Sequence, residues 1–369
     1  MKKQRFILFS VALLFLLGSI ALAGGTKEAP ELEAVEKEVE EEELASEVKV
    51  YMSATRENNE LISRLIYEGL GVKVIQHFMS CGEVGARLRS EAPRFSADMA
   101  INLCAAEAFE AKREGWAIPY ISKEWAGAGK AFEDPDGVLT KLANYSTILI
   151  GNKDMLDEAG YTLPESWDDL LDPKWRGQIV VPSAVTSGNG YIILYSAMTL
   201  YGFNKGLTGK EAEDAGFKYL EALDKNIHHY ARSSSTPADL VGRREFMLGM
   251  TQDAAALARI RKGYPLVWRA FDEGIGYGGT FALILKGAKE EYTCKKIIDF
   301  LGTKEVCEAY ADLGNYVTKD PTVIPALYRD VGQLPKYITN LNEEWAVENK
   351  ARLVTEWKER FLMKQEKKE

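Results

Sequence analysis

The order of strand and helix signals between residues 48 and 103 constrains the fold of this chain more than any other feature. Strands are predicted at 48–52, which is mostly apolar, at 72–78 and at 99–103, and segments with helical periodicity at 56–68 and 83–90 separate them. Strands joined in this way by helices form right-handed βαβ units with parallel strands. The sequence therefore predicts an α/β fold with a mostly parallel sheet covered by helices.

A second α/β group follows along the chain. Strands are predicted at 147–152, 178–181 and 246–250, and helices at 167–171, 191–200 and 211–223. The chain after residue 47 has about 320 residues, which is more than one hydrophobic core usually serves. Two lobes are therefore expected.

The turn between the strand at 178–181 and the helix at 191–200 has the composition of an anion-binding site. It contains Thr186, Ser187, Gly188, Asn189 and Gly190. The first N–H groups of a helix have no carbonyl partner and lie at the positive end of the helix dipole, and here hydroxyl groups lie beside them. An ordinary Ser/Thr cap of the helix is the alternative interpretation.

Several segments, all in one order, resemble the extracytoplasmic solute-binding proteins of ABC transporters, in the family that includes ferric-iron, phosphonate and hexose-phosphate binders. They extend over residues 48–313 and read VYMSATRENNELI, SCGEVGARLRSEAPRFSADM, SWDDLLDPKWRGQIVVPSAVTSGNGY, SSSTPADLVGRREFMLGMTQDAAA and FALILKGAKEEYTCKKIIDFLGTKE. The resemblance implies a type II periplasmic-binding-protein fold, in which two crossing strands join two lobes and the ligand lies in the cleft between them. It does not identify the ligand, because members of the family bind chemically different solutes on one scaffold.

The resemblance also implies domain boundaries and hinge closure of the lobes. Residues 145–152 are the expected outgoing crossing strand, and residues 278–285 are the expected return. Lobe 1 then comprises residues 48–146 with about 278–303. Lobe 2 comprises residues 147–277 with about 304–363, including the C-terminal helices.

The candidate ligand-binding residues lie where strands are expected to end, because open α/β sheets bind ligands outside the carboxyl ends of their strands. Helix caps explain the hydroxyl-bearing turns equally well, including a helix start with Thr236, then Pro237, then Asp239 in the place of a capping-box acid. The full set is Ser53, Thr55, Ser80, Gly82, Glu83, Tyr145, Thr186, Ser187, Gly188, Asn189, Ser233, Asp253 and Tyr277. For Asp253 the alternative role is capping of the helix at 254–261, and for the two tyrosines it is core or hinge packing.

A small organic anion, such as a hexose phosphate or an aminoalkylphosphonate, fits these residues better than ferric iron. Iron-binding relatives typically supply adjacent tyrosines with a histidine or a carboxylate, whereas this chain has no Tyr-Tyr pair and reads Thr251-Gln252-Asp253 at the corresponding segment. His228 and His229 precede a strand-like Tyr230, and neighbours on a strand face opposite ways, so joint metal ligation by them is not expected. No metal site is predicted, and iron held by scattered tyrosines is the alternative.

A hydrolase acting on a phosphorylated substrate is the alternative from a different functional class. The TSGNG turn does not match GxSxG, and no phosphate loop GxxxxGK[ST], HExxH or CxxC is present. Ser187 has no base that the sequence alone can assign. The chain is therefore expected to bind its ligand without catalysis and without a cofactor.

The N-terminus has the pattern of a cleaved signal peptide. Lys2, Lys3 and Arg5 precede an apolar run at 6–23 that ends in small residues before Gly24. An uncleaved membrane anchor is the alternative, since the run is about long enough to span a bilayer. Cleavage near residue 23 predicts a periplasmic monomer, and the resemblance implies an ABC permease in the membrane as its partner.

Charge is concentrated in the segment after the predicted signal peptide. Residues 24–47 contain ten Glu against Lys27 and Lys37, which predicts an acidic, disordered tether. The formal net charge of the whole chain is −9, and no basic patch or helix occurs. A nucleic-acid partner is therefore not expected.

Four cysteines, Cys81, Cys104, Cys294 and Cys307, permit two disulfides in an exported chain. Pairing of Cys294 with Cys307 and of Cys81 with Cys104 is one arrangement, and buried free thiols are the alternative. No spacing typical of a zinc site occurs.

Overall fold

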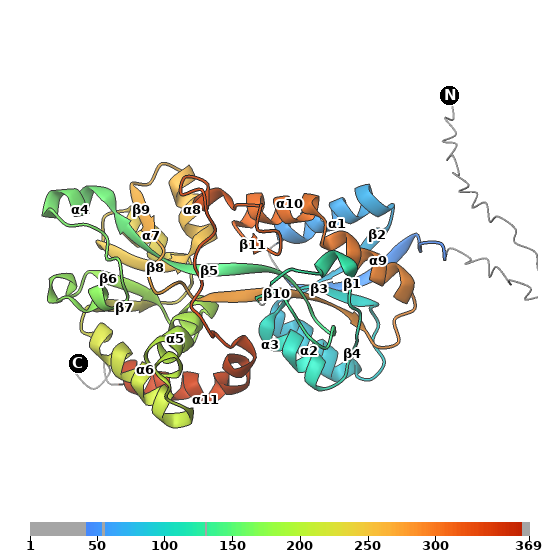
Figure 1. Ribbon diagram of the computed structural model, residues 1–369, viewed down its shortest axis with the longest axis horizontal. Helices are drawn as coiled ribbons and strands as arrows, with labels where there is room; N and C mark the ends of the chain where they lie inside the picture. The colour runs from blue at the N-terminus through green and yellow to red at the C-terminus, as the bar shows by residue number, and fades with distance from the viewer. Residues whose placement is uncertain (1–41, 54–55, 130, 364–369) are drawn as a thin grey trace, which may run out of the picture. The chain divides into compact units, whose positions relative to one another are not determined.

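The structure, a computed structural model, describes residues 42–53, 56–129 and 131–363 (Figure 1). The predicted signal peptide and most of the predicted acidic tether lie outside these residues. Glu47, at the end of the expected tether, already belongs to the first strand. In the described part of the chain, no helix combines the length and the apolar character needed to cross a membrane.

The first three strands form a parallel sheet in the order β2-β1-β3. They are β1 (Glu47–Met52), β2 (Lys73–Phe78) and β3 (Met99–Cys104). Helices α1 (Arg56–Leu70) and α2 (Cys81–Glu91) connect them, and α3 (Ala105–Arg113) follows β3. The segments that predicted β1 and β3 are buried in the sheet, whereas β2 is an edge strand whose side chains are exposed or half-buried. The predicted strand–helix order is confirmed.

Two long strands run between the two groups of strands in Figure 1. β5 (Thr140–Asn152) pairs antiparallel with β10 (Tyr277–Leu285), with Tyr277 opposite Ser146. β10 also pairs with β3, whereas β5 continues into the second group. Both crossing strands predicted from the sequence are present, and β5 begins earlier than expected.

The second group contains β8 (Leu248–Gln252), β6 (Ile179–Pro182), β7 (Ile227–Ala231) and β9 (Leu266–Arg269). β6 lies between β7 and β8 and is parallel to both, while β8 and β9 pair antiparallel with β5. α5 (Gly188–Tyr201) follows β6 and is buried from Asn189 to Leu200, as expected for a helix that is apolar on all sides. α6 (Gly209–Asp224) packs against it.

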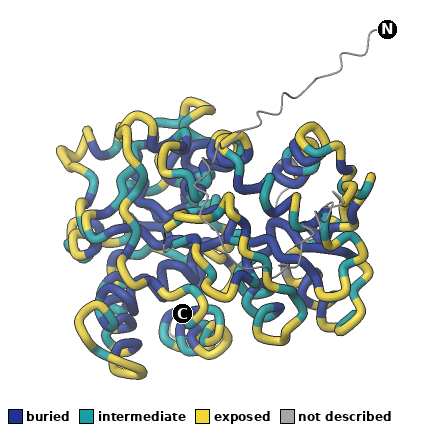
Figure 2. Tube along the Cα trace, turned by 45° about the vertical axis from the view of Figure 1, so that its right-hand side comes forward, coloured by how far each residue is buried: buried dark blue, intermediate teal, exposed yellow. Residues whose placement is uncertain are grey.

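The remaining elements cover the two sheets or connect their strands. They are β4 (Ala117–Ile118), α4 (Lys153–Ala159), α7 (Thr236–Gly242), α8 (Asp253–Arg261), α9 (Glu291–Leu301), α10 (Lys304–Gly314), β11 (Val317–Thr318), α11 (Glu343–Phe361) and the 3₁₀ helices at 123–125, 168–171, 173–175, 203–205 and 326–328. Burial follows this arrangement, with strands largely buried and exposure concentrated in loops and outer helices (Figure 2).

The carboxyl ends of β3 and β8 meet the crossing strands at neighbouring points. Cys104 at the end of β3 lies opposite Thr280 of β10, which pairs with Ala143 of β5. Gln252 at the end of β8 lies opposite Thr147 of β5, four residues further along. The loops that follow the parallel strands of both sheets therefore converge where the chain crosses, as ligand-binding α/β sheets require.

The two C-terminal helices pack in different places. α11 contacts α3, α5 and α6, whereas α10 contacts α1 and α9. Val306 and Tyr310 of α10 share a core with Val48 of β1. The sequence-based boundary near residue 304 groups α10 with the second lobe, but its contacts are with helices of the first sheet.

Cys294 and Cys307 are free and buried, so the predicted disulfide between them is wrong. Cys294 packs in the core of the first sheet, while Cys307 packs with Ala311 and Val323 in a separate cluster. Burial raises the pKa of both thiols, which keeps them protonated. Cys104 is disulfide-bonded, and the side chain of its expected partner, Cys81, lies outside those that the structure describes.

Candidate ligand-binding site

The start of α5 presents two backbone N–H groups without a hydrogen-bond acceptor in the described part of the chain. Ser187 is the N-cap, and its hydroxyl oxygen accepts from the Gly190 N–H at 3.4 Å. The Ser187 N–H donates to the Ser183 carbonyl at 3.0 Å, and the Tyr191 N–H donates to the Ser187 carbonyl at 3.1 Å. The N–H groups of Gly188 and Asn189 are therefore the two without an acceptor among the described residues, and they lie at the positive end of the helix.

The two glycines of this turn have different surroundings. A Cβ atom on Gly190 would lie 2.4 Å from the carbonyl carbon and oxygen of Ser183, so no other residue fits there. A Cβ atom on Gly188 would meet only the Tyr145 hydroxyl oxygen, at 3.7 Å. The space beside Gly188 is therefore open to a ligand atom.

Contacts with β5 fix the position of the α5 start. The Asn189 amide nitrogen donates to the Thr147 hydroxyl at 2.7 Å and to the Ser146 carbonyl at 3.5 Å. Asn189 is 3% exposed, and its side chain serves this attachment. Burial, with a smaller contribution from Glu343, raises the pKa of Tyr145, which leaves a neutral phenol beside Gly188.

The turns after β6 and β7 lie against each other. The Thr186 hydroxyl donates to the Arg232 carbonyl at 2.7 Å. Ser233 interacts with the Thr236 hydroxyl at 2.8 Å and accepts from the Thr236 N–H at 3.3 Å. Arg232 is exposed and takes part in none of the ion pairs found within the described residues. Sequence patterns do not reveal this cation, because nothing local links Arg232 to the turn at Thr186.

The capping box predicted at the start of α7 is wrong. Ser235 precedes the helix in a helical rather than an extended conformation, and its side chain makes no capping bond. Asp239 instead pairs with Arg259 of α8 at 2.7 Å. This contact joins residues twenty positions apart, and the capping pattern does not reveal it.

The turn after β1 is held by a buried polar network. The Ser53 hydroxyl donates to the Asn102 carbonyl at 2.7 Å. Asn102 has a positive φ of 61°, donates to Asn59 at 2.8 Å and accepts from the Tyr310 hydroxyl at 2.6 Å. A non-glycine residue in this region is uncommon and often marks a functional turn. Thr55, the other candidate here, lies outside the described residues.

A further contact joins α1 to the segment before β11. The Asn58 amide donates to the Tyr316 hydroxyl at 3.2 Å. Tyr316 is largely buried, which raises its pKa to about 12. Neither residue was a candidate, because the 258 positions between them hide the contact from sequence patterns.

Ser80 and Glu83, two of the candidate residues at the start of α2, form a capping box with each other. The Ser80 N–H donates to the Glu83 carboxylate at 2.8 Å, and the Glu83 N–H donates to the Ser80 hydroxyl at 3.4 Å. The hydrogen bond from the Ser80 backbone is the main cause that lowers the pKa of Glu83. Gly82 is exposed, and open space surrounds it.

Asp253 is fully buried at the start of α8. Its carboxylate accepts from the Ala254 N–H at 2.8 Å and from the Tyr328 hydroxyl at 3.0 Å. Burial raises its pKa to about 7. The structure thus places Asp253 where it ties α8 to the loop around Tyr328, with no surface exposed to a solute.

We expect Asp253 to make folding stability pH-dependent. Its pKa is raised from 3.8 to about 7, so between these values the folded protein binds more protons than the unfolded chain. Its contribution to stability is therefore present below about pH 4 and is lost as the pH rises through 7, with a total of the order of 2–4 kcal/mol. Urea unfolding at pH 4.5 and pH 8 should show this loss in the wild type and not in Asp253→Asn. Parallel pH profiles would contradict the assignment.

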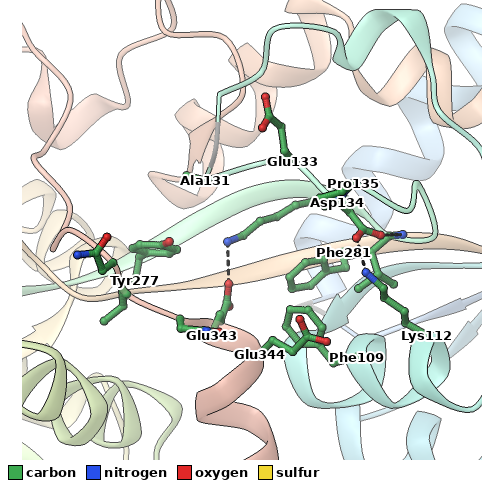
Figure 3. A pocket seen from close by; sticks show the side chains of 15 residues that line it. Phe109, Lys112, Ala131, Glu133, Asp134, Pro135, Tyr277, Phe281, Glu343 and Glu344 are labelled. Carbon is green, nitrogen blue, oxygen red and sulfur yellow. Dashed lines mark hydrogen bonds and ion pairs between the residues drawn. The ribbon is translucent and has the colours of Figure 1, made fainter. Parts of the chain in front are cut away.

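Tyr277 lines a separate cavity of about 490 Å³, bounded by α3, the loop at 131–136, β5, β10 and the segment before α11 (Figure 3). Lys141 forms an ion pair with Glu343 there at 2.7 Å, and its ammonium nitrogen lies 4.6 Å from the centre of the Tyr277 ring. The side chains of Lys141 and Glu343 are 9% and 10% exposed. Tyr277 thus packs against a buried ion pair.

Two sheets joined by two crossing strands, with strand ends and helix starts converging at the crossing, define the class of two-lobed, type II periplasmic binding proteins. The family model for bacterial extracellular solute-binding proteins matches residues 97–331, and the chain belongs to that family.

Curated relatives support the same grouping. The chain is 27% identical over 263 residues to an uncharacterized protein of Haemophilus influenzae, covering 69% of this chain and 72% of the relative. It is 25% identical over 191 residues to a Salmonella paratyphi A protein with the provisional name 2-aminoethylphosphonate-binding periplasmic protein. That match covers 50% of this chain and about half of the relative (53%).

Solved structures share the fold. The periplasmic binding protein AfuA of Actinobacillus pleuropneumoniae, solved with exogenous fructose-6-phosphate, is 23% identical with a TM-score of 0.67, covering 86% of this chain and 99% of that one. The apo ferric ion-binding protein A of Pasteurella haemolytica is 20% identical with a TM-score of 0.70, covering 85% and 98%.

Proposed function

We propose that this protein is the solute-binding component of an ABC importer and captures a small anionic solute, a phosphorylated sugar or a phosphonate, between its two lobes. The observation that carries the proposal is the start of α5. There, the N–H groups of Gly188 and Asn189 lack acceptors within the described residues, and open space lies beside Gly188. Phosphate and phosphonate oxygens are the acceptors that such a helix start binds best.

Each neighbouring group has a role in this proposal. The hydroxyls of Ser187 and Thr186 lie beside the two N–H groups, and the neutral phenol of Tyr145 donates a further hydrogen bond. Arg232, on the turn that contacts Thr186, supplies positive charge for the dianion. Ser53, Ser80, Gly82 and Ser233, on the converging turns, close over the uncharged part of the solute.

Each of the two proposed lobes is built on one of the two sheets. Lobe 1 contains the first sheet with α9 and α10, lobe 2 contains the second sheet with α5 to α8, and β5 and β10 form the hinge. We further propose that the protein is exported through a cleaved signal peptide and is a periplasmic monomer. Its partner in this proposal is a permease in the membrane. Membership of the extracellular solute-binding family supports the periplasmic location and the permease partner.

Binding without catalysis is part of the proposal. The hydrogen bonds found for Ser187 join it to Gly190, Ser183 and Tyr191. His228 and His229 contact each other and Phe246. No base that would activate Ser187 as a nucleophile is therefore seen among the described residues.

Mass spectrometry of the natively purified protein tests the proposal, followed by thermal unfolding with fructose-6-phosphate, 2-aminoethylphosphonate and ferric citrate. A ligand that binds only the folded state at one hundred times its Kd stabilises it by about 2.7 kcal/mol. We expect a raised Tm with one of the two phosphorus compounds and no release of inorganic phosphate. A raised Tm with ferric citrate alone identifies an iron carrier, and phosphate release identifies a hydrolase.

A further inference from the structure

Two neighbouring histidines on β7 have their rings side by side. The Nδ1 atoms of His228 and His229 lie 3.0 Å apart, and the ring planes are inclined by 83°. Neighbouring residues on a regular strand face opposite ways, so the expectation from sequence that these two rings diverge is wrong.

A β-bulge explains the difference. Ile227 lies opposite Ile179 of β6, but His229 lies opposite the very next residue, Val180. His228 is therefore an extra residue with no partner of its own on β6. A bulge of this kind redirects a side chain, and here it brings the two imidazoles together.

The spacing of the two nitrogens suits a shared metal ion. Two imidazole nitrogens bound to one ion at about 2.0–2.1 Å lie about 2.9 Å apart at a right angle and about 3.4 Å apart at the tetrahedral angle. The separation of 3.0 Å is close to the right-angle value. Square-planar or tetragonal geometry with nitrogen ligands is typical of Cu²⁺ and Ni²⁺.

The surroundings keep the pair ordered and accessible. The Phe246 ring packs against both imidazoles, with centroid distances of 4.7 Å to His228 and 5.6 Å to His229. His228 is exposed and His229 is half-buried.

We propose that His228 and His229 together bind one Cu²⁺ ion, or Ni²⁺ with lower affinity, through their Nδ1 atoms, with water in the remaining positions. Within the described residues, no group of three or more His, Cys, Asp or Glu could hold a metal ion, so these two imidazoles are the only protein ligands invoked. The residues lie in the first half of β7, whereas the turn at Ser233 follows its end. The site therefore does not depend on the proposed solute-binding function.

Titration of the tag-free mature protein with Cu²⁺ at pH 7.4 tests the site by calorimetry and by electron paramagnetic resonance. We expect one equivalent bound with a hyperfine pattern from two nitrogens. Affinity should fall at least tenfold in His228→Asn and in His229→Asn, since each loses one of two ligands. His77→Asn is the matched control, because His77 is the remaining histidine of the chain, and its affinity should equal that of the wild type.

The spectrum of the wild type alone can overturn the proposal, whether or not the variants fold. A pattern from one nitrogen or from none would mean that the two imidazoles share a hydrogen bond and not a metal ion. Equal Cu²⁺ affinity in the wild type and in a folded His228→Asn/His229→Asn variant would have the same meaning.

Discussion

Gly188→Ala is expected to lower the affinity for the phosphorylated solute at least tenfold, which corresponds to about 1.4 kcal/mol or more of binding free energy. The new methyl group enters the open space beside the α5 start, where the nearest atom is the Tyr145 hydroxyl oxygen at 3.7 Å. It displaces the solute oxygen that the Gly188 N–H binds. Calorimetric titration with the solute identified by mass spectrometry measures the loss.

The stability of the empty Gly188→Ala protein is the control. The methyl group meets no atom closer than ordinary van der Waals contact, so the free energy of unfolding should change by less than about 1 kcal/mol. Unchanged affinity in this folded variant would place the solute elsewhere.

Gly190→Ala is the matched comparison two residues further along α5. Its Cβ atom would lie 2.4 Å from the Ser183 carbonyl, which belongs to the backbone and cannot rotate away. We expect a destabilisation of about 3 kcal/mol or more, with loss of binding as a consequence of misfolding. If Gly188→Ala lowered the stability and Gly190→Ala lowered only the affinity, the open space would lie beside Gly190 and not beside Gly188.

Glu343→Gln is expected to destabilise the protein by about 3–5 kcal/mol, because it leaves the ammonium group of Lys141 buried without its counter-charge. The two side chains form a 2.7 Å ion pair and are 9% and 10% exposed. Glu343 also accepts from the Gly279 N–H of β10, so it joins α11 to both crossing strands. Urea unfolding measures the change.

Two further variants separate this effect from the loss of an ordinary surface ion pair. Lys141→Met with Glu343→Gln removes both charges, and most of the lost stability should return, because a buried pair is nearly neutral against apolar groups. Asp157→Asn breaks an exposed pair with Lys153 and should cause no measurable change. If Glu343→Gln behaves like Asp157→Asn, the pair is solvated and does not hold the crossing strands.

The first sheet and the crossing strands could be predicted because their signals are local. The run at 48–52 is apolar except for Lys49, and helices of matching periodicity lie between the strands. β7 (Ile227–Ala231) was not among the predicted strands of the second group, although Tyr230 is strand-like in sequence, because the segment contains His228 and His229 and is a strand only through pairing with β6. The segment at 168–171 forms a 3₁₀ helix and not an α-helix, since Pro173 follows within two residues.

The candidate site was predictable in part for the same reason. The N-cap at Ser187 and the glycines beside it form a local motif. At Ser80 a plain helix cap was the alternative interpretation, and the structure has a capping box with Glu83. Contacts between distant segments were not predictable. Tyr328 donates a hydrogen bond to Asp253, which is 75 positions away in the sequence. Thr186 donates to the carbonyl of Arg232, which is 46 positions away.

The most direct test of the account follows the amide resonances of Gly188 and Asn189 by ¹⁵N–¹H NMR while the identified solute is added. Unpartnered N–H groups that begin to donate to an anion move downfield, so these two resonances should show the largest downfield shifts in the spectrum. Saturable solute binding that leaves both resonances unmoved, while other amides shift, would contradict the claim that α5 holds the anion.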